Sequence, residues 1–356
     1  MHQELVVGVD AGGTRTRAVL APAEAAREGR GLPWLGEGAA GPGNALTVPV
    51  PQLTEHLAEA VGRAVPEPDR SRVVAVAGGF AGGGVSPGGP GRGSALSALT
   101  AALRRLGITA GSVTVGSDIE AVFASAPGAP ADGLALVAGT GAIATRVTGR
   151  RCTAVVDGGG WLLGDDGGGF WLGRAAVRAA LRMADGRGPE TVLGVRVGRA
   201  LGVPEEVLPG GPEQPGTGGS PGRAAGTAHA EPAASTAWSR RHREAYRRHV
   251  LPAVMGDPPV RLARFAPLVA EAARAGDPVA EALLDEAAGH LADSVRALRP
   301  RPGERIVATG GLLGPDGPLT ALLTPRLDAL GLTLDWVPDG CRGAVALARL
   351  AHAARP

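Results

Sequence analysis

The chain contains no lysine: its 36 basic residues are all arginine. A Walker P-loop needs a lysine on the nucleotide phosphates, and a protein kinase needs a strand lysine beside the phosphates of its ATP. Schiff-base catalysis needs a side-chain amine. The sequence therefore excludes these three chemistries. If the protein uses ATP, then backbone amides, hydroxyl groups, Mg²⁺ and arginine must hold it.

Cysteine, clustered histidine and long apolar runs are also scarce. Cys152 and Cys341 are too few for a disulfide framework or a Cys-rich zinc site, and the seven histidines show no metal-ligand spacing. No apolar run is long enough to span a bilayer, and no signal peptide is evident. The formal net charge is only +2, which indicates neither a basic tail for nucleic-acid binding nor a polybasic membrane patch. We therefore expect a cytoplasmic protein that binds neither nucleic acid nor membranes.

Residues 6–20 combine two apolar runs with a glycine turn between them. The first run, 6–9, is typical of a buried strand. The turn Gly12-Gly13-Thr14 lets backbone N–H groups approach a ligand and adds a hydroxyl. Asp10, at the end of the first run, is placed for a hydrated Mg²⁺. The pattern predicts a hairpin tip that cradles phosphate, with an ordinary glycine-turn hairpin as the alternative.

The strand–turn–strand order of residues 6–20 returns at 134–147, which predicts two related halves. A length of 356 residues fits two domains. Alternating strands and helices favour an α/β fold with a largely parallel sheet. The domains expected are 1–127, 128–340 with a flexible Gly/Pro-rich insertion at 209–237, and a terminal helix at 341–356 that packs back on the first domain.

Apolar spacing and turn residues predict the individual elements. The expected strands are 6–9, 33–39, 72–77, 113–116, 134–138, 142–147, 151–156, 305–308 and 332–336. The expected helices are 53–65, 94–106, 118–126, 171–183, 243–298 with breaks near 257 and 277, and 340–354.

Glycine-containing turns follow four of the short buried strands, at 10–16, 139–142, 157–169 and 309–314. In an open α/β sheet, ligands bind beyond the carboxyl ends of the strands. Several of these turns could therefore meet in one cleft and contact phosphates and a nucleoside through their backbones.

Four further polar or aromatic positions have two interpretations each. Asp118, between a strand and a helix, is an N-cap or a general base that takes a proton from a hydroxyl. Asp165 or Asp166 caps the following helix or accepts hydrogen bonds from sugar hydroxyls. Trp161 stacks on a ring or lies in the core, and Asn44 is a turn residue or a sugar contact.

The ordered set of motifs resembles the sugar-kinase/Hsp70/actin superfamily. The set is Asp10-Ala-Gly-Gly-Thr14, Asp118, Gly139-Thr140-Gly141, Gly164-Asp165-Asp166-Gly167 and Gly310-Gly311. Within it the chain resembles N-acetylglucosamine kinases and the related BadF/BadG/BcrA/BcrD ATPase-type proteins, over nearly its whole length except the insertion. The resemblance implies two ribonuclease-H-like (actin-like ATPase) domains with a cleft that closes on ATP and a sugar.

The resemblance also implies a role for each matching residue. Asp10 would hold Mg²⁺ and Asp118 would be the catalytic base. The ATP contacts would be Gly12, Gly13 and Thr14 in the first phosphate loop, Thr140 and Gly141 in the second, and Gly310, Gly311 and Gly314 in the adenosine loop. The sugar contacts would be Asn44, Gly78, Gly159, Gly160, Trp161 and Asp165.

The implied activity is ATP-dependent phosphorylation of N-acetylglucosamine or glucosamine at the 6-hydroxyl. The chain departs from the family pattern near the base, at Ile119 and Glu120, in the second phosphate loop, at Ala142, and in the sugar motif. There Gly159 replaces a tryptophan, Asp166 a glutamate and Gly168 a serine.

A kinase for a cyclitol or a cell-wall sugar is therefore an alternative. A nucleotide-switch activator ATPase is another, although its iron–sulfur cysteines have no clustered counterpart here. The sequence leaves open a homodimer and the choice between Asp165 and Asp166.

Overall fold

The structure, a computed structural model, describes residues 3–24, 34–84, 89–210 and 238–354. The chain forms two compact units, one made of Met1–Gly158 with His290–Pro356 and the other of Gly159–Gly289. The expected domain border at 127/128 falls inside the first unit. Almost all of the expected insertion, 209–237, lies outside the described residues.

The first unit contains two five-stranded sheets. The first sheet has the order β3-β2-β1-β4-β5 and consists of β1 (Leu5–Ala11), β2 (Thr16–Pro22), β3 (Gly36–Ala40), β4 (Val73–Phe80) and β5 (Ser112–Ser117). The second has the order β10-β9-β6-β7-β8 and consists of β6 (Gly133–Ala138), β7 (Ala142–Thr148), β8 (Arg151–Asp157), β9 (Arg305–Thr309) and β10 (Thr333–Trp336).

Both sheets have the same topology, which confirms the predicted repeat and the pair of ribonuclease-H-like cores. In each, the first three strands pair antiparallel and the fourth and fifth join parallel to the first. The prediction of a largely parallel sheet is wrong, because the short turns at 12–15 and 139–141 can connect only antiparallel strands.

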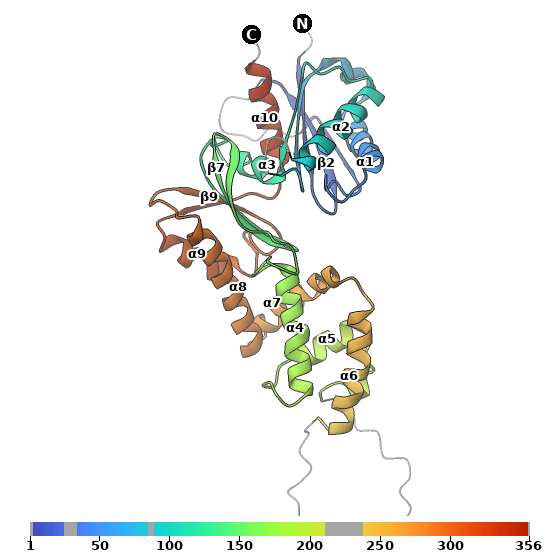
Figure 1. The fold of residues 1–356 in the computed structure, drawn as a ribbon, viewed down its shortest axis with the longest axis vertical. Helices are drawn as coiled ribbons and strands as arrows, with labels where there is room; N and C mark the ends of the chain where they lie inside the picture. The colour runs from blue at the N-terminus through green and yellow to red at the C-terminus, as the bar shows by residue number, and fades with distance from the viewer. Residues whose placement is uncertain (1–2, 25–33, 85–88, 211–237, 355–356) are drawn as a thin grey trace, which may run out of the picture. The chain divides into compact units, whose positions relative to one another are not determined.

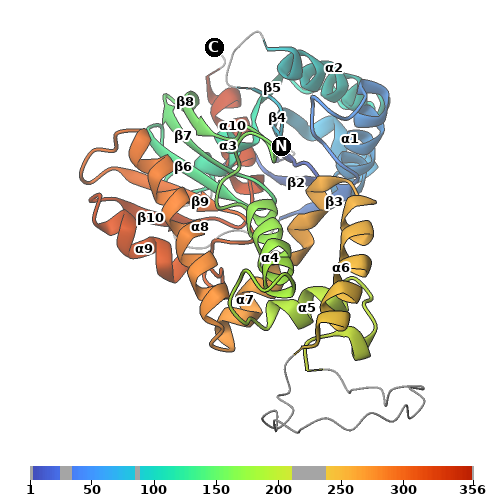
Figure 2. The ribbon, with the colours of Figure 1, turned by 60° about the horizontal axis from the view of Figure 1, so that its bottom comes forward.

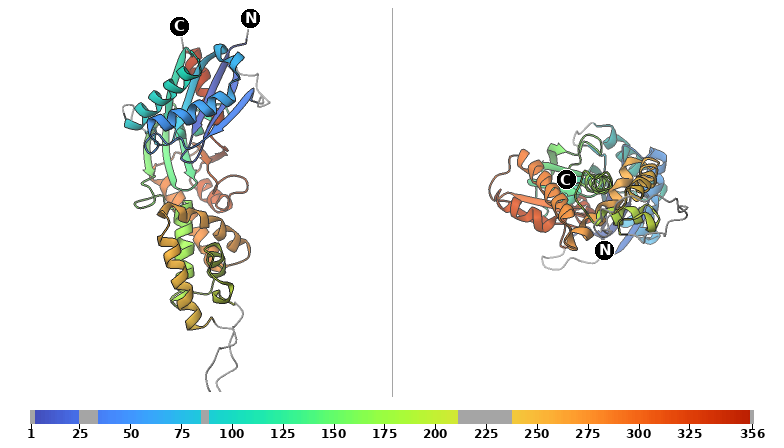
Figure 3. Two further views of the ribbon diagram at one scale, coloured as in Figure 1. Left: turned by 90° about the vertical axis from the view of Figure 1, so that its right-hand side faces the viewer. Right: turned by 90° about the horizontal axis from the view of Figure 1, so that it is seen from below.

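Helices cover both faces of the first sheet (Figure 1). The helices of this unit are α1 (Val50–Ala64), η1 (Glu67–Arg72), α2 (Pro90–Arg105), α3 (Asp118–Ala124), α9 (Thr320–Asp328) and α10 (Cys341–Ala353). The helices α1 and α2 bury one face, and Figure 3 (left) shows α1 lying across the strands. The other face packs on α10 through Val6, Ala75 and Val345. The core around α3 reaches the second sheet through Phe123, Ala135 and Val307.

Two glycines allow α10 to lie against β1 and α3. A Cβ atom on Gly8 would come within 2.7 Å of the backbone nitrogen of Val345, and one on Gly343 within 1.7 Å of the carbonyl oxygen of Ala121. The helix therefore approaches closely enough for its first turn to reach the end of β1, where Asp10 lies.

We expect Gly343→Ala to lower the free energy of unfolding by at least about 1–3 kcal/mol, because backbone atoms of Ala121 and Ser125 would have to move. The matched control is Gly93→Ala in α2, where nothing lies within 4 Å of the added Cβ. There helix propensity should raise stability by about 0.5–1 kcal/mol. Urea denaturation measures both, and equal midpoints would contradict the close packing.

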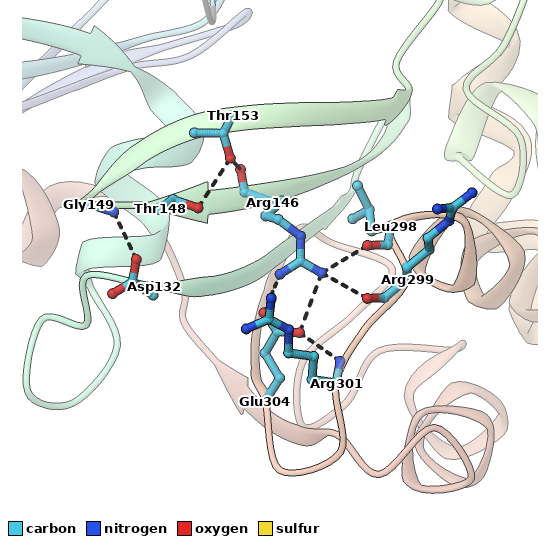
Figure 4. Close-up of polar contacts among 9 residues, drawn as sticks. All are labelled: Asp132, Arg146, Thr148, Gly149, Thr153, Leu298, Arg299, Arg301 and Glu304. Carbon is cyan, nitrogen blue, oxygen red and sulfur yellow. Dashed lines mark hydrogen bonds and ion pairs between the residues drawn. The ribbon is translucent and has the colours of Figure 1, made fainter.

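A polar network joins the second sheet to the segment before β9 (Figure 4). Arg146 of β7 donates to the carbonyl oxygens of Leu298 and Arg299, at 2.8 and 3.2 Å, and forms an ion pair with Glu304. Glu304 also accepts a hydrogen bond from the backbone N–H of Arg301 at 2.9 Å. The guanidinium thus satisfies carbonyl groups left without partners at a helix end.

The second unit is helical (Figure 2). Its elements are α4 (Gly169–Ala184), α5 (Leu193–Ala200), η2 (Glu205–Val207), α6 (Arg240–Met255), η3 (Pro259–Phe265) and α7 (Ala266–Arg274), and α8 (Pro278–Ala297) begins here and continues into the first unit. The predicted breaks near 257 and 277 are confirmed. Asp277 caps α8, since its Oδ1 accepts from the backbone N–H of Ala280 at 2.9 Å.

Some helix boundaries and two whole helices differ from the sequence prediction. The helix α2 begins at Pro90 rather than 94, because proline is well suited to the first turn. The short helices α5 and α9 were not predicted: α5 carries glycines and α9 contains Pro325. Packing stabilises α5, where a Cβ on Gly198 would lie 2.9 Å from the Tyr246 ring. Within the described ranges, no helix is long and apolar enough to cross a membrane.

Candidate functional site

A cavity of about 420 Å³ lies in the first unit at the carboxyl ends of strands from both sheets. Its walls come from the hairpin after β1, the start of α3, the end of β6, the turn after β9 and the segment before α10. The lining residues are Asp10, Gly12, Thr14, Arg15, Arg17, Asp118, Ile119, Val122, Val137, Thr309, Gly310, Gly311, Pro338 and Asp339. The structure therefore brings the predicted first phosphate loop, base, metal ligand and adenosine loop to one cavity.

The hairpin tip is closed by its own backbone. The N–H of Gly12 donates to the carbonyl oxygen of Arg15 at 2.9 Å, and the N–H of Gly43 donates to the carbonyl oxygen of Gly12 at 2.9 Å. No atom lies within 4 Å of a Cβ placed on Gly13, and Thr14 is exposed. The tip thus presents backbone and a hydroxyl to open space, as a phosphate site requires.

The second phosphate turn and the adenosine turn are in contact. Gly310 has a φ of +110°, and a Cβ there would lie 2.2 Å from the carbonyl oxygen of Ala138. The N–H of Leu312 donates to the same oxygen at 3.1 Å. Thr140 is exposed and Gly141 half-buried in the adjoining turn. Gly314, with a φ of +116°, is buried against the Trp336 indole and shapes the turn.

Asp118 is the first residue of α3, and Ser117 is the N-cap. The prediction of Asp118 as the cap is therefore off by one position. Its Oδ1 accepts from the Ser117 hydroxyl at 3.1 Å and from the backbone N–H of Ile119 at 3.0 Å. In the described part of the chain no group donates to Oδ2, which leaves that oxygen for a reacting hydroxyl.

Burial raises the pKa of Asp118 above its ordinary value, although the hydrogen bonds from Ser117 and Ile119 oppose the shift. A helix N-terminus favours the ionised form of a carboxyl group. Removal from water outweighs that effect here. A carboxylate with a raised pKa is a stronger proton acceptor, which suits a general base.

Asp10 lies beside a second carboxylate, Asp339, that the sequence prediction missed. Ligand atoms of Asp10, Asp339 and Cys341 lie within 4.8 Å of one another. The backbone N–H of Gly340 donates to Asp10 Oδ2 at 3.1 Å, and that of Cys341 to Asp339 Oδ1 at 2.9 Å. The signal was present, because Asp339 comes shortly after the last strand, β10, as Asp10 lies near the end of the first, β1.

The donor set at this point fits Mg²⁺, which prefers carboxylate oxygen. Burial raises the pKa of Asp10 to about 6, and the nearby Asp339 and Asp118 add to the shift. Burial also raises the pKa of the Cys341 thiol, so this sulfur stays protonated. Asp10 and Asp339 are therefore the residues that would hold the ion.

Two arginines complete the cavity wall and were not among the predicted site residues. Arg17 forms an ion pair with Asp339 at 2.7 Å, and its charge lowers the pKa of Asp10. Arg15 is exposed at the hairpin tip. In a chain without lysine, these guanidinium groups are the cations available beside the phosphate turn.

The first unit also holds two predicted sugar contacts, Asn44 and Gly78. The side-chain oxygen of Asn44 accepts from the backbone N–H groups of Leu46 and Thr47, at 2.9 and 3.2 Å. This is a turn role that leaves the amide NH₂ for other contacts. Gly78 is buried in β4, where a Cβ would lie 2.5 Å from the Phe80 ring. Neither residue lines the cavity.

The remaining predicted sugar contacts, Gly159, Gly160, Trp161 and Asp165, lie at the start of the second unit. Trp161 is 40% exposed, and its ring centroid lies 5.6 Å from that of Phe170. Asp165 has a left-handed backbone with a φ of +60°. The cap of α4 is Gly168, so neither Asp165 nor Asp166 has the capping role. Trp171, by contrast, is buried.

Glu120, one of the departures from the family pattern, has a structural role beside the base. Its buried side chain forms an ion pair with Arg151 at 3.0 Å and accepts from the backbone N–H of Cys152 at 3.1 Å. It therefore fixes α3 to the edge strand β8. A Cβ on Gly116 would lie 2.3 Å from Glu120 Oε2, so a larger residue there would displace this carboxylate.

The repeated five-stranded sheets and the cavity of glycine turns and carboxylates at their strand ends define a protein of the actin-like ATPase class. The sequence profile of the BadF/BadG/BcrA/BcrD ATPase family matches residues 7–326. The chain belongs to this family, and ATP use follows from membership.

Solved structures share the fold at low identity. A candidate N-acetylglucosamine kinase from Chromobacterium violaceum is 21% identical with a TM-score of 0.64, covering 97% of this chain and 99% of that chain. Another from Porphyromonas gingivalis is 20% identical with a TM-score of 0.66, covering 98% and 99%. No curated protein sequence matches the chain.

Proposed function

We propose that this protein is an ATP-dependent kinase that phosphorylates an amino sugar, N-acetylglucosamine or glucosamine, at its 6-hydroxyl. The observation that carries the proposal is the half-buried Asp118 carboxylate in one cavity with the glycine–threonine hairpin tip. The folds of the two candidate N-acetylglucosamine kinases support the choice of acceptor.

The residues of the cavity divide the work of phosphoryl transfer. Asp118 would orient the acceptor hydroxyl through Oδ2 and take its proton. The hairpin tip and Arg15 would bind phosphate oxygens, and Asp10 and Asp339 would hold Mg²⁺, which neutralises charge on the transferring group. Positioning and electrostatics supply most of the rate in this reaction class.

The test is ADP release by the purified protein with Mg-ATP and a panel of acceptors: glucosamine, N-acetylglucosamine, N-acetylmannosamine, glucose, anhydro-N-acetylmuramic acid and several cyclitols. Turnover that depends on an amino sugar supports the proposal. Turnover with a cyclitol or cell-wall sugar alone would replace the acceptor but keep the kinase. Hydrolysis that no acceptor stimulates would favour a nucleotide switch.

Asp339→Asn probes the metal assignment separately from the base. We expect the Mg²⁺ concentration for half-maximal activity to rise by about tenfold, because one of two carboxylates facing the ion is lost. Saturating Mg²⁺ should restore most of kcat. The matched control is Asp335→Asn on the nearby strand β10, which pairs with Arg305 instead. An unchanged Mg²⁺ dependence in Asp339→Asn would remove this residue from the metal site.

A further inference from the structure

The second unit carries a pocket that the proposed reaction does not use. Its volume is about 410 Å³, within the range of small-molecule sites. It lies between α4, the segment 188–191 and the first turns of α8. Its wall includes three arginines, Arg174, Arg178 and Arg182, and the apolar side chains of Val279 and Leu283.

The three arginines lie on one face of α4, four residues apart. This spacing places successive side chains about 6 Å apart along the axis, so that together they span about 12 Å. Like charges at this spacing destabilise a helix by about 0.2–0.5 kcal/mol per pair. The first turn of α4 contains no acidic residue that would offset them.

Within the described residues, none of these three arginines forms an ion pair with a carboxylate. Arg174 lies over the Phe170 ring at 5.7 Å, and Arg182 donates only to the carbonyl oxygen of Arg187 at 3.2 Å. Other arginines of the unit do pair, as Arg196 with Glu271 at 2.7 Å. The row therefore concentrates positive charge on one wall of a concave site, whose lining also includes the Glu286 carboxylate.

We propose that this pocket binds a phosphate ester of a small hydroxylated molecule. A guanidinium group can donate two parallel hydrogen bonds to two oxygens of one phosphate group. Val279 and Leu283 provide an apolar wall for the organic part of the ligand. Glu286, also in the lining, accepts hydrogen bonds from hydroxyl groups and disfavours a bare inorganic anion. A sugar phosphate and a nucleoside monophosphate both carry this chemistry. The assignment does not rest on the kinase proposal.

Arginine footprinting tests the site directly. In a chain without lysine, phenylglyoxal marks guanidinium groups, and mass spectrometry of peptides gives a rate for each one. The probes are glucosamine 6-phosphate, AMP, inorganic phosphate and unphosphorylated glucosamine. We expect a phosphate ester at about ten times its Kd to slow the labelling of Arg174 and Arg178 about tenfold. Arg241 on α6, exposed and outside the pocket, is the internal reference.

The two ester probes distinguish the sources of the ligand, since protection by only one identifies it as sugar phosphate or nucleotide. The variant Arg178→Gln should weaken binding of that ester at least tenfold in calorimetry, and the matched Arg241→Gln should leave it unchanged. Protection must persist in Asp118→Asn, which separates this site from the kinase reaction. The proposal would be overturned if no probe slowed the labelling of Arg174 and Arg178 more than that of Arg241. It would also be overturned if unphosphorylated glucosamine protected them as strongly as the phosphate esters do.

Discussion

Asp118→Asn should lower kcat for phosphoryl transfer by about 10²–10⁴-fold, with little change in ATP binding. The amide cannot take a proton, yet its oxygen can still accept the hydrogen bonds that Ser117 and Ile119 donate to Oδ1. The local structure of α3 is therefore preserved. Steady-state ADP release measures kcat, and equilibrium titration with a nucleotide measures the binding that should survive.

The matched control for this substitution is Asp132→Asn. Asp132 is exposed and accepts a hydrogen bond from the backbone N–H of Gly149 at 2.9 Å, which asparagine can keep. It should leave kcat unchanged. If Asp118→Asn kept more than about a tenth of the parent kcat, the carboxylate would position the acceptor rather than take its proton.

The order of elements in the first unit was largely predictable, because it depends on local signals. Buried apolar runs, rich in β-branched residues in β1 and β4, mark these two strands and β6, and the glycine turns that follow them mark the strand ends. The repeat of the hairpin pattern was enough to predict two equivalent sheets. What local signals could not give was the pairing of the strands beyond the hairpin, because β3 and β4 follow longer connections that allow either direction.

The site was predictable where a residue adjoins a glycine turn and less so where packing brings distant segments together. Asp10 lies near the end of β1 and Asp118 directly follows β5, each within a readable motif. Asp339 lies outside the four glycine turns predicted from the sequence, and it reaches Asp10 only because Gly8 and Gly343 let α10 approach β1 and α3. The raised pKa of Asp118 was equally hidden, since it depends on burial that the sequence does not show.

Asp10→Asn should make the protein without ligand more stable while abolishing most Mg²⁺-dependent turnover. Burial and the charges of Asp339 and Asp118 raise the pKa of Asp10 to about 6 from an ordinary value of 3.8. At pH 7 both the folded and the unfolded chain carry the ionised group, so this shift opposes folding by up to about 3 kcal/mol. Asparagine removes the buried charge and can still accept the Gly340 N–H.

The raised pKa of Asp10 fixes the direction in which the stability difference changes with pH. As the pH falls from 7 to 4, the folded protein takes up the proton on Asp10 before the unfolded chain does, so the parent protein regains the lost stability. The gap in unfolding free energy between Asp10→Asn and the parent should be about 1–3 kcal/mol at pH 7 and close by about pH 4. Denaturant titrations at each pH, with Asp132→Asn as the control, measure it. A parent protein at least as stable as Asp10→Asn at pH 7 would mean that Arg17 and the α10 N-terminus already compensate the Asp10 charge. In that case the raised pKa of Asp10 would not indicate an unfavourable negative charge that a bound cation relieves.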